Sequence, residues 1–133
     1  TLLSLNTILG HDYYNIGEYQ RSFESLSEGL SHYQFLGRYK FAGAMKAEFL
    51  TQYVLSALAV GNMQEAKDGG RIITELTYTG YDQWNSTNAL IYIGQAWEQE
   101  DQAKAQEYFQ QAYDLANERG FEDLKNGIAE LLK

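Results

Sequence analysis

Apolar side chains recur every three or four residues along almost the whole chain, and short polar or glycine-containing breaks interrupt them. This spacing is the period of an α-helix that buries one face. No stretch shows convincing alternation of apolar and polar side chains, which a β-strand would need. The pattern predicts an all-α chain of seven helices, over residues 1–16, 18–36, 41–60, 62–78, 85–97, 102–119 and 121–132.

Glycine and capping residues mark the ends of these helices. Gly17, Gly37, Gly61 and Gly120 follow periodic stretches, and glycine readily adopts the left-handed conformation that ends a helix. Side-chain oxygens that accept from the first backbone N–H groups are expected at the helix starts. The predicted caps are Asn62, with Glu65 reaching back as in a capping box, then Asn85, Ser86 or Thr87, and finally Asp101.

Gly69 and Gly70 lie in the middle of the fourth predicted helix. Each glycine costs a helix roughly 1 kcal/mol relative to alanine. The pair indicates either close contact with a neighbouring helix or a deliberate weak point in the chain.

The seven helices pair into three antiparallel hairpins, about residues 1–36, 38–79 and 82–119, with a terminal helix at 121–132. Their turns at Gly17, Gly61 and Asp101 are 44 and 40 residues apart. Repeats of this length are typical of a solenoid, in which stacked hairpins bury the faces that one hairpin leaves open. We therefore expect residues 1–133 to form one domain.

Within each hairpin, small residues stand where the helices should cross and bulky ones stand beside them. In the first hairpin the pattern consists of Leu9, Gly10, Tyr13, Gly17, Tyr19, Leu26 and Gly29, with Ser22 at a further position. This pattern resembles the tetratricopeptide repeat (TPR), in which alanine is usual at the position of Ser22. The third matches at Ile93, Gly94, Trp97, Ala105, Phe109 and Ala112. The second keeps Tyr53, Ala57, Gly61, Met63 and Ala66.

The second hairpin departs from the family pattern at Val54, where glycine is preferred, and at Gly70 and Ile73. The repeats exceed the 34-residue TPR minimum, and no proline closes any of them. They look like the longer-helix TPRs of bacterial signalling regulators, peptide receptors and kinesin light chains. Another α-solenoid or a plain helical bundle stays open as an alternative.

The resemblance implies a TPR-like α-solenoid whose first helices line a concave groove that holds a peptide or a partner helix. Matching positions identify a partner-binding set, here called the inner-helix set: Thr7, His11, Tyr14, Asn15, Glu48, Thr51, Leu55, Asn88, Ile91, Gln95, Glu98 and Gln99, with Leu58 beside them. Amide and hydroxyl groups in this set could bond an extended backbone, and Leu55 and Ile91 could form an apolar floor. An ordinary solvated helix face is the alternative.

TPRs that dock chaperone C-termini hold the terminal carboxylate with a clamp of lysine, asparagine and arginine. The matching positions here hold no lysine or arginine, and the groove would carry Glu48 and Glu98. Carboxylates repel a carboxylate ligand. The expected partner is therefore a protein or peptide of a different kind, one with basic or amide groups.

The formal net charge of −8 disfavours direct contact with a phosphate backbone, so nucleic acid is not an expected partner. The ten lysines and arginines form no obvious basic stripe, and no apolar run is long enough to span a membrane. The absence of cysteine fits a cytoplasmic location. Because the sequence begins at Thr1, we expect a fragment or a processed product.

The chain shows no arrangement that predicts catalysis or a cofactor. His11 and His32 lack the further ligands that a metal site needs. Glu98, Glu100 and Asp101 form an acidic turn that is most simply a solvated surface. The chain also lacks a nucleophile elbow and a phosphate loop. The expectation is a protein that is not an enzyme and holds no metal.

An aromatic group near the first inter-repeat turn is expected to pack between the first two hairpins, or, if exposed, to mark a contact site. Its members are Tyr33, Phe35, Tyr39, Phe41 and Phe49.

The most consistent hypothesis is a non-catalytic scaffold that binds a protein or peptide. The alternatives are a regulatory module that senses a ligand or peptide within a larger signalling protein or transcription regulator, and a spacer that self-associates through its terminal helices.

Overall fold

The computed structural model describes the backbone of residues 2–36, 43–77 and 83–133, and the side chains of residues 5–30, 49–75 and 83–133. Regular structure in these ranges is entirely α-helical, without a strand. The helices are α1 (Leu2–Asn15), α2 (Tyr19–Leu36), α3 (Gly43–Ala59), α4 (Met63–Thr77), α5 (Gln83–Trp97), α6 (Gln102–Arg119) and α7 (Glu122–Leu131). The predicted stop at Gly37, the break near residue 80, Tyr39 and Phe41 lie outside the described residues, as do the side chains of His32, Tyr33, Phe35 and Glu48.

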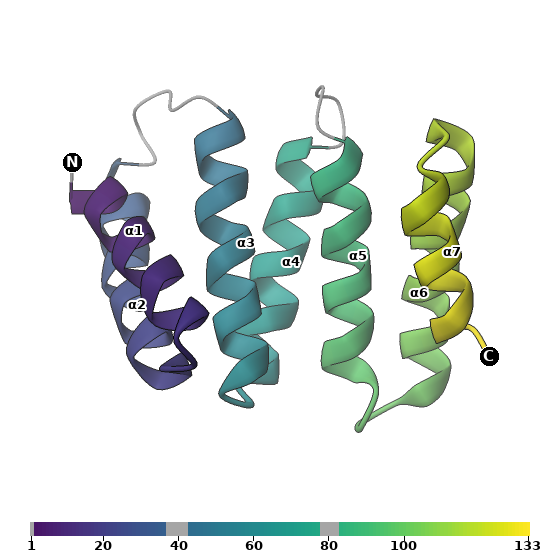
Figure 1. Ribbon diagram of the computed structural model, residues 1–133, viewed down its shortest axis with the longest axis horizontal. Coiled ribbons are helices and arrows are strands. Elements are labelled where there is room, and N and C mark those ends of the chain that lie inside the picture. Colours follow the sequence, from purple (N-terminus) through teal and green to yellow (C-terminus); the bar gives the residue numbers. More distant parts are fainter. Residues whose placement is uncertain (1, 37–42, 78–82) are drawn as a thin grey trace.

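The helices pack in chain order as antiparallel hairpins. α1 packs on α2, α3 on α4 and α5 on α6, and α4 also packs on α5. Figure 1 shows two layers, with α1, α3, α5 and α7 in front and α2, α4 and α6 behind. The prediction of an all-α chain of sequential hairpins is confirmed.

Three helices end in the same glycine turn. Gly17, Gly61 and Gly120 have φ values of 83°, 81° and 75°, a left-handed conformation that other residues rarely adopt. The residue after each glycine donates its N–H to the carbonyl five positions back: Glu18 to Tyr13 (2.9 Å), Asn62 to Ala57 (2.8 Å) and Phe121 to Ala116 (2.9 Å). This is a Schellman-type ending, and it confirms these predicted stops.

Two predicted caps are also present. Asp101 Oδ1 accepts from the backbone N–H of Lys104 at 3.0 Å, and Asn62 Oδ1 accepts from that of Glu65 at 3.4 Å. The prediction that the Glu65 side chain reaches back to Asn62, as the second contact of a capping box, is wrong. The Glu65 carboxylate instead accepts a 2.6 Å hydrogen bond from the Tyr53 hydroxyl, which α3 presents to α4.

The predicted start of the fifth helix is wrong as well. α5 begins at Gln83, so Asn85, Ser86 and Thr87 lie within the helix. Ser86 and Thr87 are buried, and the Thr87 hydroxyl donates to the Gln83 carbonyl at 2.7 Å. A hydroxyl that bonds back by four residues is satisfied within a helix, which explains why these residues do not cap it.

Small residues allow the hairpins to close. A methyl group added at Gly10 would clash with Leu26, and one added at Gly94 would lie 2.5 Å from a ring carbon of Phe109. The bulky side chain is therefore on the second helix in the first and third hairpins. Ser22 is buried at the first crossing, where its hydroxyl donates to the Gly10 carbonyl at 2.6 Å.

The core is built from two clusters of buried side chains. The first connects α2 through α5 and contains Leu26, Phe49, Leu50, Tyr53, Val54, Ala57, Ala66, Ile73, Ala89 and Ala96. The second connects α5, α6 and α7 and contains Ile91, Ala105, Phe109, Ala112, Ala116 and Ile128. The terminal helix thus closes one end of the stack by burying Ile128, while Leu5 and Leu9 of α1 stay exposed at the other end.

Candidate functional site

The inner-helix set is distributed over the front layer of helices. α1 carries Thr7, His11, Tyr14 and Asn15, α3 carries Glu48, Thr51 and Leu55, and α5 carries Asn88, Ile91 and Gln95. α1 contacts α3, and α3 contacts α5. The α1 and α3 members therefore lie on neighbouring helices, as a shared binding face requires.

A hollow of about 140 Å³ lies between α1 and α3. Its lining brings two members of the set, Thr7 and His11, together with Ile8, Asp12 and Gln52. This combination offers a hydroxyl, an imidazole, a carboxylate and a carboxamide around one aliphatic side chain. Such a mixture of hydrogen-bonding and apolar groups suits a peptide side chain together with its adjoining backbone.

His11 and Asn15 form a polar pair one helical turn apart. The Asn15 amide nitrogen lies 3.3 Å from Nδ1 of His11, and Asp12 Oδ1 lies 4.0 Å from the same ring atom. When Asn15 donates to Nδ1, the neutral imidazole carries its proton on Nε2. His11, whose side chain is about half exposed, can then donate from Nε2 to a carbonyl group of a bound peptide.

Two tyrosine rings meet where α1 is followed by α2. The ring centroids of Tyr14 and Tyr19 are 5.0 Å apart. Tyr14, a member of the inner-helix set, therefore lies against the first residue of α2. Burial raises the pKa of Tyr92 on α5, and the electrostatic influence of Tyr14 raises it further.

Other members of the set are less available. Ile91 is only 8% exposed and belongs to the core cluster shared with α6 and α7, so it offers little surface to a partner. The Asn88 amide donates to the Trp84 carbonyl at 3.0 Å. Glu98 and Gln99 lie in the turn after α5 rather than on the helix, and Gln95 is exposed. Thr51 and Leu55 are half-buried.

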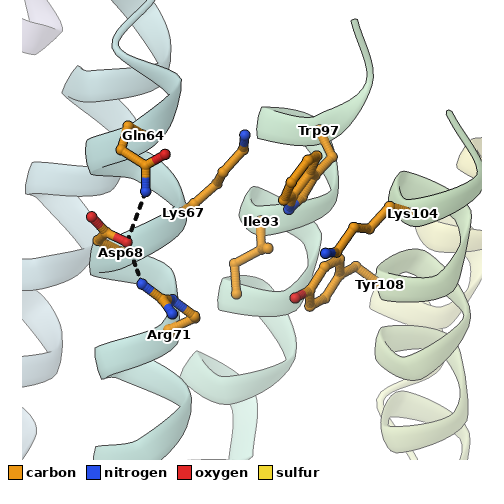
Figure 2. A pocket seen from close by; sticks show the side chains of 8 residues that line it. All are labelled: Gln64, Lys67, Asp68, Arg71, Ile93, Trp97, Lys104 and Tyr108. Carbon is orange, nitrogen blue, oxygen red and sulfur yellow. Dashed lines mark hydrogen bonds and ion pairs between the residues drawn. The ribbon is translucent and has the colours of Figure 1, made fainter. Parts of the chain in front are cut away.

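A second pocket, on α4, α5 and α6, has no counterpart in the sequence predictions. It gathers Lys67 and Arg71 of α4 with Lys104 of α6 around Trp97 of α5 (Figure 2). These cations come from two helices more than thirty residues apart in sequence, so no linear stripe reveals them. The spacing of Lys67 and Arg71, one helical turn apart, is the one available signal.

Two features are absent from the part of the chain that the structure describes. No group of three or more histidine, cysteine, aspartate or glutamate side chains is arranged to hold a metal ion. None of the described helices combines the length and the apolar character that crossing a membrane requires.

The chain matches no known family model, and no curated protein matches it.

Proposed function

We propose that the chain is a divergent TPR-like solenoid that acts as a non-catalytic cytoplasmic scaffold for a protein or peptide. The solenoid proposal is supported by the equivalent glycine turns of the first two hairpins, at Gly17 and Gly61, and by the crossings of Gly10 with Leu26 and Gly94 with Phe109. These contacts recur at equivalent points of the first and third hairpins, as repeated units would require.

The observation that carries the binding proposal is the hollow between α1 and α3. Thr7, His11, Asp12 and Gln52 place donors and acceptors around Ile8, which is itself well exposed. An exposed aliphatic side chain surrounded by hydrogen-bonding groups is favourable to cover with an amphipathic ligand.

The proposed ligand is a peptide with basic or amide side chains. Asp12 contributes a negative charge at the hollow, Glu98 contributes another after α5, and the whole chain carries a net charge of −8. Lysine or arginine on the ligand would be attracted by this field, and asparagine or glutamine could pair with Gln52.

Selection from a random peptide library displayed on phage tests the proposal. The expected result is enrichment of sequences with lysine, arginine, asparagine or glutamine. The double variant Asp12→Lys/His11→Ala should weaken binding of a selected peptide by about tenfold or more, the equivalent of one lost charged hydrogen bond. Glu130→Gln, at an exposed position of α7, is the matched control and should bind as the wild type does. Undiminished binding by the double variant would contradict the proposal.

We also propose that the chain self-associates through α1, and one comparison within the chain favours this. Leu5 is 52% exposed, whereas Phe49, 44 positions later, is 1% exposed; Leu9 and its equivalent Tyr53 are 37% and 3% exposed. In the second hairpin this face packs on the preceding hairpin, where Phe49 meets Gly29. The face of α7 that lacks a packing partner carries Asp123, Asn126 and Glu130, so it is polar and would not pack against the exposed leucines of α1. We therefore propose that two copies of the chain associate symmetrically, with α1 of one copy against α1 of the other.

A further inference from the structure

A cationic pocket of about 180 Å³ lies between α4 and α6, with α5 as its floor. Figure 2 shows Lys67, Asp68 and Arg71 on one side, with Asp68 and Arg71 turned toward each other, and Lys104 and Tyr108 on the other side. Trp97 and Ile93 project between them from α5. α4 and α6 belong to the layer behind α3 and α5 in Figure 1, so this pocket and the hollow between α1 and α3 are separate sites.

Three of the ten lysines and arginines of an acidic chain meet here. Lys67 pairs with Glu100 at 2.5 Å, and Arg71 pairs with Asp68. Among the described residues, the Lys104 ammonium has no carboxylate within 4.0 Å. Three cations and two carboxylates leave the pocket one positive charge in excess, which suits a ligand with a single negative charge.

The two lysines flank one indole ring. Lys67 Nζ lies 3.6 Å and Lys104 Nζ 4.4 Å from the Trp97 ring centroid, and Figure 2 shows Trp97 between them. Each contact is a favourable cation–π interaction, but the two ammonium groups also repel each other. An anion placed beside Lys104 would relieve this repulsion while keeping both ring contacts.

The pocket continues into a wider hollow of about 390 Å³ along the same groove. The two share Arg71, Ile93 and Tyr108. The wider part adds Leu90 and Leu115 together with polar groups from Thr74, Ser86, Gln83 and Gln111. A ligand that reaches both parts therefore meets a cation at one end and an aliphatic surface at the other, within the size range of ordinary ligand sites.

We propose that this groove binds a peptide through one carboxylate held by Lys104, with an adjoining apolar side chain against Leu90 and Leu115. The single excess charge favours a carboxylate over a phosphate group, which carries more than one negative charge near neutral pH. The site goes beyond the scaffold proposal, since it uses other helices and a ligand of opposite charge.

Fluorescence of Trp97 gives a direct readout, because the chain has only two tryptophans. Trp84→Phe removes the other one and keeps an aromatic ring against Phe121, whose centroid lies 5.2 Å from that of Trp84. In this background we expect saturable fluorescence changes with N-acetyl-leucyl-glutamate that is amidated at its C-terminus. The glutamine counterpart of this peptide should bind about tenfold more weakly or worse, because the charged contacts are lost.

Variants of Lys104 decide between this site and unspecific attraction. Lys104→Gln should weaken binding of the glutamate peptide about tenfold, whereas Lys104→Arg should retain binding. Lys125→Gln is the matched control, since Lys125 also lies near an aromatic ring, 6.0 Å from the centroid of Tyr113, but outside the groove. Equal affinity of wild type and Lys104→Gln would overturn the proposal. Tighter binding of inorganic phosphate than of the peptide would also overturn it.

Discussion

Val54 on α3 fills the space that a side chain at position 69 of α4 would need: a methyl group added at Gly69 would lie 2.7 Å from Val54 Cγ2. In the first and third hairpins the glycine is on the first helix and the bulky partner on the second. The second hairpin has the reverse arrangement. The second hairpin therefore departs from the repeat pattern through an exchange of positions: the large side chain is on its first helix and the small residue is on its second.

This exchange predicts coupled stability changes. Gly69→Ala should destabilise the protein, because overpacking costs about 1–3 kcal/mol and outweighs a helix-propensity gain of roughly 1 kcal/mol. Val54→Ala should cost about 2 kcal/mol through the cavity that it leaves. The free energy of unfolding of the double variant should fall by less than the sum of the two single losses, and the difference should be at least about 1 kcal/mol. Urea denaturation of the four proteins measures this difference.

Gly127→Ala is the control for that experiment. Gly127 also lies within a helix, but a methyl group there meets no other atom within 4 Å. This change should stabilise the protein by up to about 1 kcal/mol. Destabilisation at both glycines, or strictly additive effects at Val54 and Gly69, would contradict the packing explanation.

Alkaline pH should weaken the fold through Tyr53. Burial, and then the hydrogen bond to Glu65, raise the pKa of Tyr53 far above its ordinary value of 10.0. Above that ordinary value the unfolded chain releases the Tyr53 proton while the folded chain retains it. The free energy of unfolding should therefore fall as pH rises, by about 1.4 kcal/mol per pH unit for this group.

Tyr53→Phe isolates this contribution. Urea denaturation between about pH 9 and pH 12 should show that the wild type loses stability more steeply than the variant, and the difference in slope should approach one proton, about 1.4 kcal/mol per pH unit, above about pH 11. Below this range the variant should be less stable by about 1 kcal/mol, because the hydrogen bond to Glu65 is lost. Parallel pH profiles of the two proteins would show that Tyr53 is not protected in the fold.

The exposed leucines of α1 should control association rather than folding. Leu5→Gln/Leu9→Gln should leave the stability of the monomer within about 0.5 kcal/mol, since both side chains are accessible to water. Sedimentation velocity should show concentration-dependent association of the wild type and its loss in the double variant. Ile72→Gln, at an exposed position of α4, is the control. A wild type that stays monomeric at every concentration would rule out association through α1.

The stability of the fold should depend on the ion pair between the buried ammonium group of Lys67 and Glu100. Glu100→Gln should cost about 1 kcal/mol, because it leaves a charge without its counter-ion beside Trp97. In a Lys67→Met background, which keeps the aliphatic stem, the same change should cost close to nothing. Thermal denaturation of the four combinations measures this coupling. Equal costs of Glu100→Gln in both backgrounds would show that the pair is not coupled.

Much of the fold could be predicted from local signals. Gly17, Gly61 and Gly120 end helices through a conformation that glycine adopts easily, and Asp101 caps α6 with its own side chain. The Gly69–Gly70 pair proves to be the predicted close contact: Gly69 meets Val54, and a methyl group at Gly70 would lie 2.5 Å from Ile93. This packing role removes support for a weak point that would flex in a sensor.

The remaining features depend on contacts between distant residues. Ser86 and Thr87 resemble caps in sequence, but tertiary packing buries them inside α5. Ile91 matches a groove position, yet α7 and α6 complete a core around it. The pocket of Lys67 and Lys104 exists only because α4 and α6 both pack on α5, an arrangement that no short window of sequence contains.

The most direct test of the scaffold proposal is a titration of isotope-labelled protein with a library-selected basic peptide, followed by NMR chemical shifts of the backbone amides. We expect the largest changes at His11, Asn15 and Gln52, on the two helices that line the hollow. Changes confined to α4 and α6, or no changes at saturating peptide, would contradict the proposal.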